Sequence, residues 1–333
     1  MTQSVELSAL VANNPMGFLA ALGVAQICAS QLGDPQVLVG WPEGPSLGAV
    51  LSTSAAPNRK ELAIALSSIA ASLTAPNLVP GIANFPPNSE KTADTDPIRL
   101  FSFELGREAA LQAIAEPSCE PWVTSILALD EPIRSEKRRG SLSVTPFAAR
   151  GPGTVMLART MAKLGERAAQ PAAMEEALEF WVREDSIAGY LDARAKRNAA
   201  HRASRKDLDN YGVPAAGWLA LASLPLFPAA STNADVAVAP GWRRVGKRSH
   251  FRWPTWSAPI GVDAIRILLS SRVVAHLNMK DLGSDPVGTR LSDSQLRSLG
   301  ITSVWESERL VEGNNDGALS TPIRLWPRRN SEG

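Results

Sequence analysis

Apolar residues recur at helical spacing in several stretches of the chain, and the first such stretch begins at residue 15. Asn14 is a favourable N-cap and Pro15 a favourable first helical residue, so the sequence predicts a helix that starts there. Phe18, Leu22 and Ala25 form one apolar face. The small residues between them would allow the backbone of another element to come close.

Further helices are predicted wherever apolar positions repeat at intervals of three and four residues. They cover residues 59–73, 106–115, 121–129, 154–165, 172–181, 262–277 and 292–299. Period-two alternation predicts strands at residues 36–41, 100–105 and, weakly, 235–238. Residues 76–97 are rich in Pro, Asn and Asp and are predicted to form a long surface loop.

Two β-hairpins are predicted in the C-terminal half. Residues 241–256 read G-W-R-R-V-G-K-R-S-H-F-R-W-P-T-W, with a turn at Gly246-Lys247, and residues 302–311 and 318–326 flank N-N-D-G. The predicted fold class is therefore α+β, mostly helical with short antiparallel strands and a C-terminal β-hairpin. We divide the chain into an N-terminal mixed α/β domain (1–130), a basic loop (131–153) and a mainly helical domain closed by the hairpin (154–333).

Charge changes this picture because it is unevenly spread. The chain has 333 residues and a formal net charge of +1, which excludes a generally basic protein and leaves only local patches for nucleic-acid contact. No Lys or Arg precedes Arg59. The later cations gather in three clusters, which we take as candidate nucleic-acid contacts. They are Lys137, Arg138, Arg139 and Arg150; Arg194, Lys196, Arg197, His201, Arg202, Arg205 and Lys206; and Arg243, Arg244, Lys247, Arg248 and Arg252.

The second cluster lies in residues 190–228, where a basic, alanine-rich helix is predicted to precede an apolar helix that ends at L-P-L-F-P. Arg194, Arg197, His201 and Arg205 would share one face of the basic helix. That face could present arginine to phosphates, or it could be an ordinary solvated surface over a packed alanine face. The basic segment 137–150 has the same two interpretations.

Tryptophans interleave with the arginines of the third cluster, at Trp242, Trp253 and Trp256. Aromatic rings and arginine together can stack the bases and neutralise the phosphates of a single strand. The alternative is that the tryptophans belong to the core, which is the interpretation that we favour while keeping the Arg and Lys residues as candidate contacts.

Motifs of catalysis are missing from the sequence. None of the three histidines has a metal-binding spacing, and neither G-x-S-x-G, G-x-G-x-x-G nor a P-loop occurs. We therefore expect no enzyme activity, no metal and no cofactor. Cys28 and Cys119 are isolated, which indicates a reducing compartment. No secretory signal or membrane span is recognised, so a cytoplasmic location is expected.

Four stretches occur in a fixed order along the chain. They are N-P-M-G-F-L-A-A-L-G-V from residue 14, Y-L-D-A-R-A-K-R-N-A-A from residue 190, P-A-A-G-W-L-A-L-A-S-L-P-L-F-P from residue 214 and F-R-W-P-T-W-S-A-P-I from residue 251. In this order they resemble a group of type I-G (formerly I-U) CRISPR-associated proteins. That group includes accessory large-subunit-like proteins and an extension region found with the helicase-nuclease of those systems.

The resemblance implies a non-catalytic subunit of a Cascade-type, RNA-guided DNA surveillance complex that acts in antiviral defence. Its partners would be guide RNA, target DNA, other effector subunits and the helicase-nuclease, with no membrane. In such complexes base pairing reads the sequence, while the protein reads backbone and a short duplex element. The basic loop and the basic helix would then contact phosphates. The alternative is a protein–protein adaptor whose flat Ala/Gly helices dock on other effector subunits without touching nucleic acid.

Overall fold

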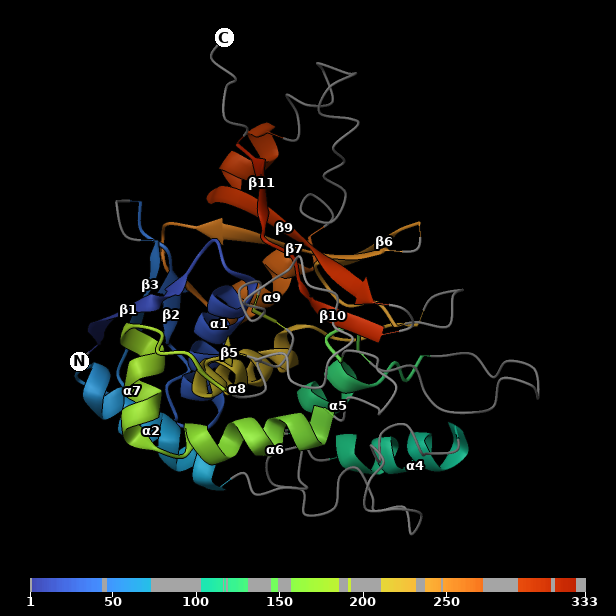
Figure 1. Ribbon diagram of the computed structural model, residues 1–333, viewed down its shortest axis with the longest axis horizontal. Helices are drawn as coiled ribbons and strands as arrows, with labels where there is room; N and C mark the ends of the chain where they lie inside the picture. Colours follow the sequence, from blue (N-terminus) through green and yellow to red (C-terminus); the bar gives the residue numbers. More distant parts are fainter. Residues whose placement is uncertain are drawn as a thin grey trace.

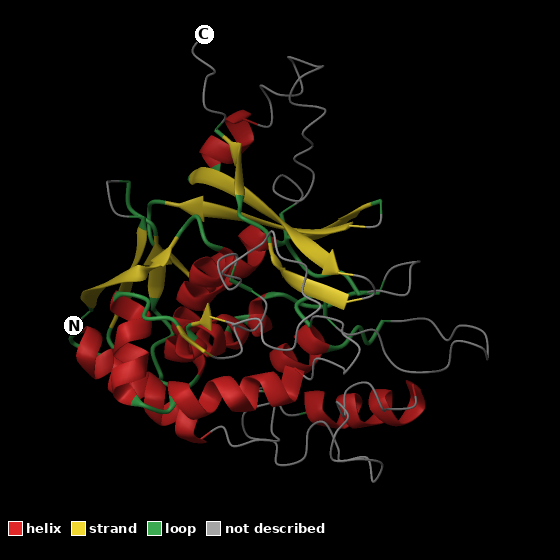
Figure 2. Cartoon of the chain, viewed as in Figure 1, coloured by secondary structure: helices red, strands yellow, loops and turns green. Residues whose placement is uncertain are grey.

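Helix α1 (Pro15–Ser30) lies at the centre of the fold, and all of its residues from Pro15 to Cys28 are buried in the computed structural model (Figure 1). The structure describes residues 2–43, 47–72, 103–115, 117, 119–130, 145–148, 157–185, 191–192, 211–231, 237–246, 248–271, 293–312 and 315–327. Within these ranges it is an α+β protein whose sheets are antiparallel. Five strands gather on one side and most helices on the other (Figure 2).

The start of α1 is set by Asn14, as its sequence predicts. The Asn14 side chain accepts hydrogen bonds from the backbone amides of Met16 at 2.9 Å and Gly17 at 3.2 Å, so it satisfies two of the free donors at the helix N-terminus. Pro15 occupies the first helical position, where its missing N–H costs nothing.

Helix α8 (Pro214–Ala222) is α1's main helical partner, and all nine of its residues are buried. A Cβ at Gly23 would lie only 1.8 Å from the carbonyl oxygen of Leu219. The two helices therefore touch through their backbones, and only glycine fits at position 23. After α8 the chain makes a short 3₁₀ turn, η2 (Leu224–Leu226), at the predicted end of the apolar helix.

A four-stranded antiparallel sheet packs beside α1. Its order is β1-β3-β2-β8, and its strands are β1 (Gln3–Val11), β3 (Gly48–Thr53), β2 (Leu38–Gly40) and β8 (Ile260–Gly261). Strand β8 comes from the C-terminal half of the chain and pairs Gly261 with Leu38. The N-terminal sheet is thus completed by a distant segment, which is followed at once by α9 (Val262–Leu269).

A five-stranded antiparallel sheet covers the other side of α1 (Figure 1). Its order is β10-β9-β7-β6, with β11 also paired to β9. The strands are β6 (Trp242–Val245), β7 (Arg248–Trp256), β9 (Ile301–Glu312), β10 (Asn315–Leu319) and β11 (Ile323–Trp326). The predicted hairpin at residues 241–256 is confirmed. The C-terminal hairpin is present, but residues 315–317 of its predicted turn belong to β10, and its predicted second strand is divided between β10 and β11. The structure adds the pairing of β7 with β9, which joins these strands into one sheet.

Five further helices lie on the side opposite the five-stranded sheet (Figure 2). They are α2 (Arg59–Ser72), α4 (Phe103–Ile114), α5 (Glu120–Ile126), α6 (Leu157–Ala168) and α7 (Pro171–Glu179). Each was predicted within a few residues, apart from the start of α4. A two-stranded ladder joins β4 (Glu184–Asp185) to β5 (Tyr211–Gly212).

One cluster of buried apolar residues extends from Val5 to Trp326. It includes residues of α1, α8 and β7, so the packing crosses the division that we predicted at residues 131–153. Within the described ranges, no helix combines the length and the apolarity that crossing a bilayer requires.

The predicted strand at residues 100–105 is wrong where it can be compared, because residues 103–105 are the first turn of α4. A window of six residues is too short to separate a strand from the beginning of an amphipathic helix, and the helix formers that follow continue the helix. Of the weak strand predicted at 235–238, only residues 237–238 are described, and Val238 forms an isolated bridge with Ala230. Strands β1 and β3 were not predicted at all. The predicted loop 76–97 lies outside the described residues.

Candidate nucleic-acid interface

The third basic cluster is the one whose side chains the structure describes, except for Lys247. Gly246, with φ of +61°, turns β6 into β7, and the register pairs Arg243 with His250 and Val245 with Arg248. The other predicted contacts lie outside the described residues. They are Lys137, Arg138, Arg139, Arg150, Arg194, Lys196, Arg197, His201, Arg202, Arg205 and Lys206.

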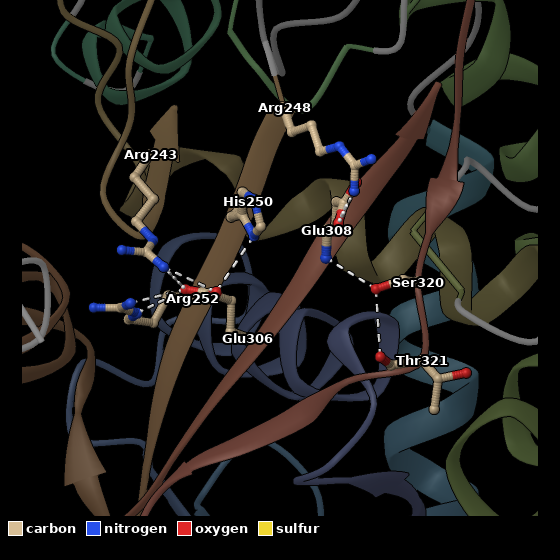
Figure 3. A network of polar contacts seen from close by, with 8 residues as sticks. All are labelled: Arg243, Arg248, His250, Arg252, Glu306, Glu308, Ser320 and Thr321. Carbon is tan, nitrogen blue, oxygen red and sulfur yellow. Dashed lines mark hydrogen bonds and ion pairs between the residues drawn. The ribbon is translucent and has the colours of Figure 1, made fainter. Parts of the chain in front are cut away.

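Alternation along β7 places Arg248, His250 and Arg252 on one face of the sheet (Figure 3). Strand β9 supplies Glu306 directly opposite Arg252 and Glu308 directly opposite His250. A cationic face of one strand therefore meets an acidic face of its neighbour, which is a favourable arrangement for cross-strand pairs.

Glu306 is the hub of this face, and 5% of its side chain is exposed. Arg252 donates to Glu306 Oε2 through Nε at 3.0 Å and through Nη2 at 2.8 Å. Arg243 donates to Oε1 at 2.9 Å, and His250 Nδ1 lies 3.3 Å from the same oxygen (Figure 3). One carboxylate thus holds two guanidinium groups and an imidazole.

Burial and pairing pull the ionisation of these groups in opposite directions. Burial alone would raise the pKa of Glu306, but the hydrogen bonds and charges of Arg243 and Arg252 outweigh it and hold that pKa below its ordinary value. Burial lowers the pKa of Arg252, against the opposing effect of Glu306. The ionised pair of Glu306 and Arg252 therefore stabilises the fold only while both partners are present, because loss of one would leave the other as an uncompensated buried charge.

The position of Arg252 removes it from the accessible surface. Its side chain is 1% exposed and engaged by Glu306, so it cannot also serve as a surface contact for a phosphate. Arg248 pairs with Glu308 at 2.9 Å but remains 68% exposed, and Arg244 is exposed with its Nε bonded to the Gly246 carbonyl. Three of the five cationic residues of this cluster, Arg243, Arg248 and Arg252, are thus paired with glutamates of β9.

The aromatic residues of the hairpin are core, as the favoured interpretation predicted. Phe251, Trp253 and Trp256 are almost completely buried, and Trp242 is 7% exposed. The indole of Trp256 donates to the Val39 carbonyl at 2.8 Å. These rings hold the five-stranded sheet on the core, and their burial leaves none of them as a base-stacking surface.

The second basic cluster begins directly after a buried anchor. Asp192 is fully buried, accepts a hydrogen bond from Asn14 Nδ2 at 3.1 Å and forms an ion pair with Arg183. At the other end, Tyr211 pairs with Asp185 in the β4–β5 ladder. Residues 193–210, which carry the seven candidate contacts of this cluster, lie outside the described residues. The described residues that flank them in the sequence are held by Asn14, Arg183 and Asp185.

Described residues on either side of the basic loop of the first cluster also contact other parts of the chain. Asp130, which precedes it, accepts a hydrogen bond from the Ser231 amide at 2.8 Å. Thr145, which follows residues 131–144, donates its amide to the Ile126 carbonyl at 2.8 Å. Phe147 then packs edge-on against Phe227, with ring centroids 5.0 Å apart.

Residues next to the first and second clusters are connected with strand β7 of the third cluster by a series of contacts. The Trp253 indole of β7 donates to the Ala12 carbonyl at 2.9 Å, two residues before Asn14. Trp253 stacks on Phe251 with centroids 5.4 Å apart, and Phe251 contacts Phe147 at the same centroid distance. We call this the anchor row; its members are Asp192, Asn14, Ala12, Trp253, Phe251 and Phe147.

The anchor row also joins the stretches on which the family resemblance is based. Asn14 begins the first stretch, Asp192 belongs to the second, α8 is the third, and Trp253 lies in the fourth. All four meet around α1, so these stretches form one structural unit.

Sequence reasoning missed Glu306, Glu308 and the pairing of Asn14 with Asp192. A signal for the glutamates was present, because E-S-E in β9 alternates with the same period as R-S-H-F-R in β7. Within the described residues, no group of three or more His, Cys, Asp or Glu is placed to hold a metal ion. Cys28 and Cys119 are buried free thiols, and burial raises the pKa of Cys28 to about 12.

The chain was compared with protein-family models, with curated proteins and with solved structures, and none of them matches.

Proposed function

We propose that the protein is a non-catalytic, nucleic-acid-binding subunit of a Cascade-type CRISPR effector complex, and that it contacts the backbone of guide RNA or target DNA. The observation that supports this proposal is the anchor row. It brings the ends of two basic segments together with the β6–β7 hairpin, although they are far apart in the sequence.

Residues 193–210 are the main contact in this proposal. They contain Arg194, Lys196, Arg197, Arg202, Arg205 and Lys206 against two aspartates. Fixed ends reduce the conformational entropy that such a segment loses when it binds a phosphate backbone. Exposed Arg244 and Arg248 would add to the same positive field, whereas Arg252 would not.

The adaptor hypothesis depends on flat Ala/Gly helices that remain available for another subunit. The structure uses α1 and α8 internally, because residues 15–28 of α1 and all of α8 are buried. The surface that α1 and α8 would offer to another subunit is therefore already occupied by the chain itself, which weakens this alternative for these two helices.

The proposal is tested by measuring affinity for fluorescein-labelled single-stranded RNA and DNA by anisotropy over a range of salt concentrations. The variant combines Arg194→Glu, Arg197→Glu and Arg205→Glu. Loss of three phosphate contacts should reduce the slope of log affinity against log salt by about 2 and weaken binding by about 10-fold or more.

The matched control combines Lys60→Glu, Lys163→Glu and Arg266→Glu. Lys60 and Lys163 are exposed, Arg266 is partly exposed, all three lie on other elements, and the change in net charge is identical. Equal affinities and slopes for the two triple variants would show that residues 193–210 are only a solvated surface. Membership of the complex is tested separately, by size-exclusion chromatography with the effector subunits in the presence and absence of guide RNA.

A further inference from the structure

The edge between β9 and β11 carries an exposed arginine, Arg324, that lies over a tryptophan ring. Arg324 is exposed, and its Nη2 donates to Ser303 Oγ at 3.0 Å. Its guanidinium lies over the Trp305 ring, 5.7 Å from the centroid. Within the described part of the chain, no carboxylate forms an ion pair with Arg324. Two contacts thus hold the guanidinium in place without neutralising it.

Other Arg–Trp pairs of the described residues differ from this one. Arg297 stacks on Trp326 but also pairs with Asp293, and Arg183 stacks on Trp181 but pairs with Asp192. Arg309 stacks on Trp242 but is buried and donates to the carbonyls of Gly317 and Pro146. In each of them the guanidinium is paired with a carboxylate or is buried, whereas Arg324 is exposed and has no carboxylate partner among the described residues.

Further arginines follow Arg324 in the sequence. Residues 323–331 contain Arg324, Arg328 and Arg329 and no carboxylate, and Glu332 follows them. Asp293, in the helix at residues 293–298, accepts hydrogen bonds from Trp326 and Arg297, so burial is outweighed and its pKa is held below the ordinary value. This acid is therefore already engaged and does not balance Arg324.

Trp305 gives the site a rigid support. Its backbone pairs with Trp253, which is fully buried, and its side chain is half-buried at the margin of the core. A planar guanidinium that rests on an indole is pre-organised to receive a base on its open face and a phosphate at its edge. A single strand offers both groups together, because its bases are not enclosed in a duplex.

We propose that Arg324 and Trp305 form a contact for single-stranded nucleic acid at the β9–β11 edge, in which Arg324 stacks on a base and binds the adjacent phosphate. This inference rests on the proposed function, since it names a second contact for the same ligand. Neither residue belongs to the three basic clusters of the sequence.

The test uses a single-stranded oligouridylate that contains 5-iodouracil, which forms photo-crosslinks with nearby aromatic side chains. Trypsin releases residues 298–309 (SLGITSVWESER), in which Trp305 is the only aromatic residue. We expect a crosslink to this peptide in the full-length wild-type chain. Arg324→Glu should reduce both the crosslink yield and the affinity by about 5-fold or more.

Two further variants separate stacking from charge. Arg324→Lys keeps the charge but loses the planar group, so its affinity should fall between those of wild type and Arg324→Glu. Arg266→Glu makes the same charge change on α9 and should leave the crosslink yield at residues 298–309 unchanged. Trp305→Leu should remove the crosslink; if this variant does not fold, the exposed Arg324 variants still decide the matter.

The possible failures can be distinguished. If wild type binds no single strand, both the proposed function and this inference are overturned. If wild type binds but Arg324→Glu behaves like Arg266→Glu, only the inference is overturned. If polyglutamate competes as well as oligouridylate at equal charge, the site is a general anion site and the assignment of stacking is overturned.

Discussion

The β6–β7 hairpin and the β9–β11 edge belong to the same sheet and carry the same residue types, yet their arginines are used in opposite ways. In the hairpin, Arg243, Arg248 and Arg252 are all paired with glutamates of β9. At the edge, Arg324 is exposed and rests on Trp305, with no carboxylate partner among the described residues. Three of the four arginines of the hairpin are thus paired with acids, and Arg244 is the exposed exception.

This difference shows that a run of cationic residues in the sequence gives the charge of one strand only and not that of the strand beside it. The strand that pairs with it decides whether the charge is free to act. For β7 that strand is β9, which brings Glu306 and Glu308 into register from about fifty residues further along the chain. Three experiments test this difference. They remove the carboxylate of Glu306, follow its titration, and measure the ion pair of Arg248 with Glu308 at the surface.

The largest effect is expected from Glu306→Gln, which leaves Arg252 buried without its carboxylate. The free energy of unfolding should fall by about 3–5 kcal/mol, because an uncompensated buried charge is costly. Denaturation with urea, followed by tryptophan fluorescence, measures this change.

The control for that experiment is Glu308→Gln, since Glu308 pairs with an arginine that is 68% exposed. Its effect should stay below about 1 kcal/mol. A double variant, Arg252→Met with Glu306→Leu, should recover most of the stability lost in Glu306→Gln. If Glu306→Gln and Glu308→Gln destabilise the protein equally, the distinction between buried hub and surface pair is wrong.

A second effect concerns acid unfolding. The pKa of Glu306 is held below its ordinary value because the arginines outweigh burial, so the ionised form stabilises the folded state. This stability is complete above the pKa of an unfolded glutamate, about 4.3, and is lost as the pH falls through the lower folded value. Stability measured from pH 7 downward should therefore have a shallower acid limb in Glu306→Gln than in wild type. Identical limbs would contradict the assignment of the lowered pKa to this residue.

The smallest effect is expected for the pair of Arg248 with Glu308. A double-mutant cycle with alanine at each position should give a coupling energy of about 0.2–1 kcal/mol, which decreases as salt is added. A coupling above about 2 kcal/mol would mean that this surface pair stabilises the protein as strongly as the buried pair of Glu306. The distinction between buried and exposed arginines would then be wrong.

Local elements of the fold were predictable because their signals are local. Asn14-Pro15 marks the start of α1, Gly246 marks the turn of the cationic hairpin, and α8 ends at its L-P-L-F-P run. Strands β1 and β3 were missed, although V-E-L in β1 alternates as a half-buried strand should. The addition of β8 to the N-terminal sheet could not be predicted, because two paired residues give too little pattern to specify a distant partner.

The candidate site was predictable only in part, for a related reason. The sequence identifies the cations, and it favours the interpretation that the tryptophans of W-P-T-W belong to the core. It does not specify which strands become neighbours, and this choice decides that Arg252 is buried and Arg324 exposed. Asn14 was recognised as a helix cap, but its second role as a partner of Asp192 depends on the tertiary fold.

The backbone contact between Gly23 and Leu219 has a consequence for how the chain folds. Helix α1 ends at Ser30, whereas its partner α8 begins only at Pro214, so a growing chain holds a largely apolar helix long before its covering surface has been synthesised. Contacts of this sequence separation make folding slow and leave apolar surface open to aggregation. Fragments that end before α8 should therefore be insoluble when expressed alone and should become soluble when the C-terminal part is produced beside them.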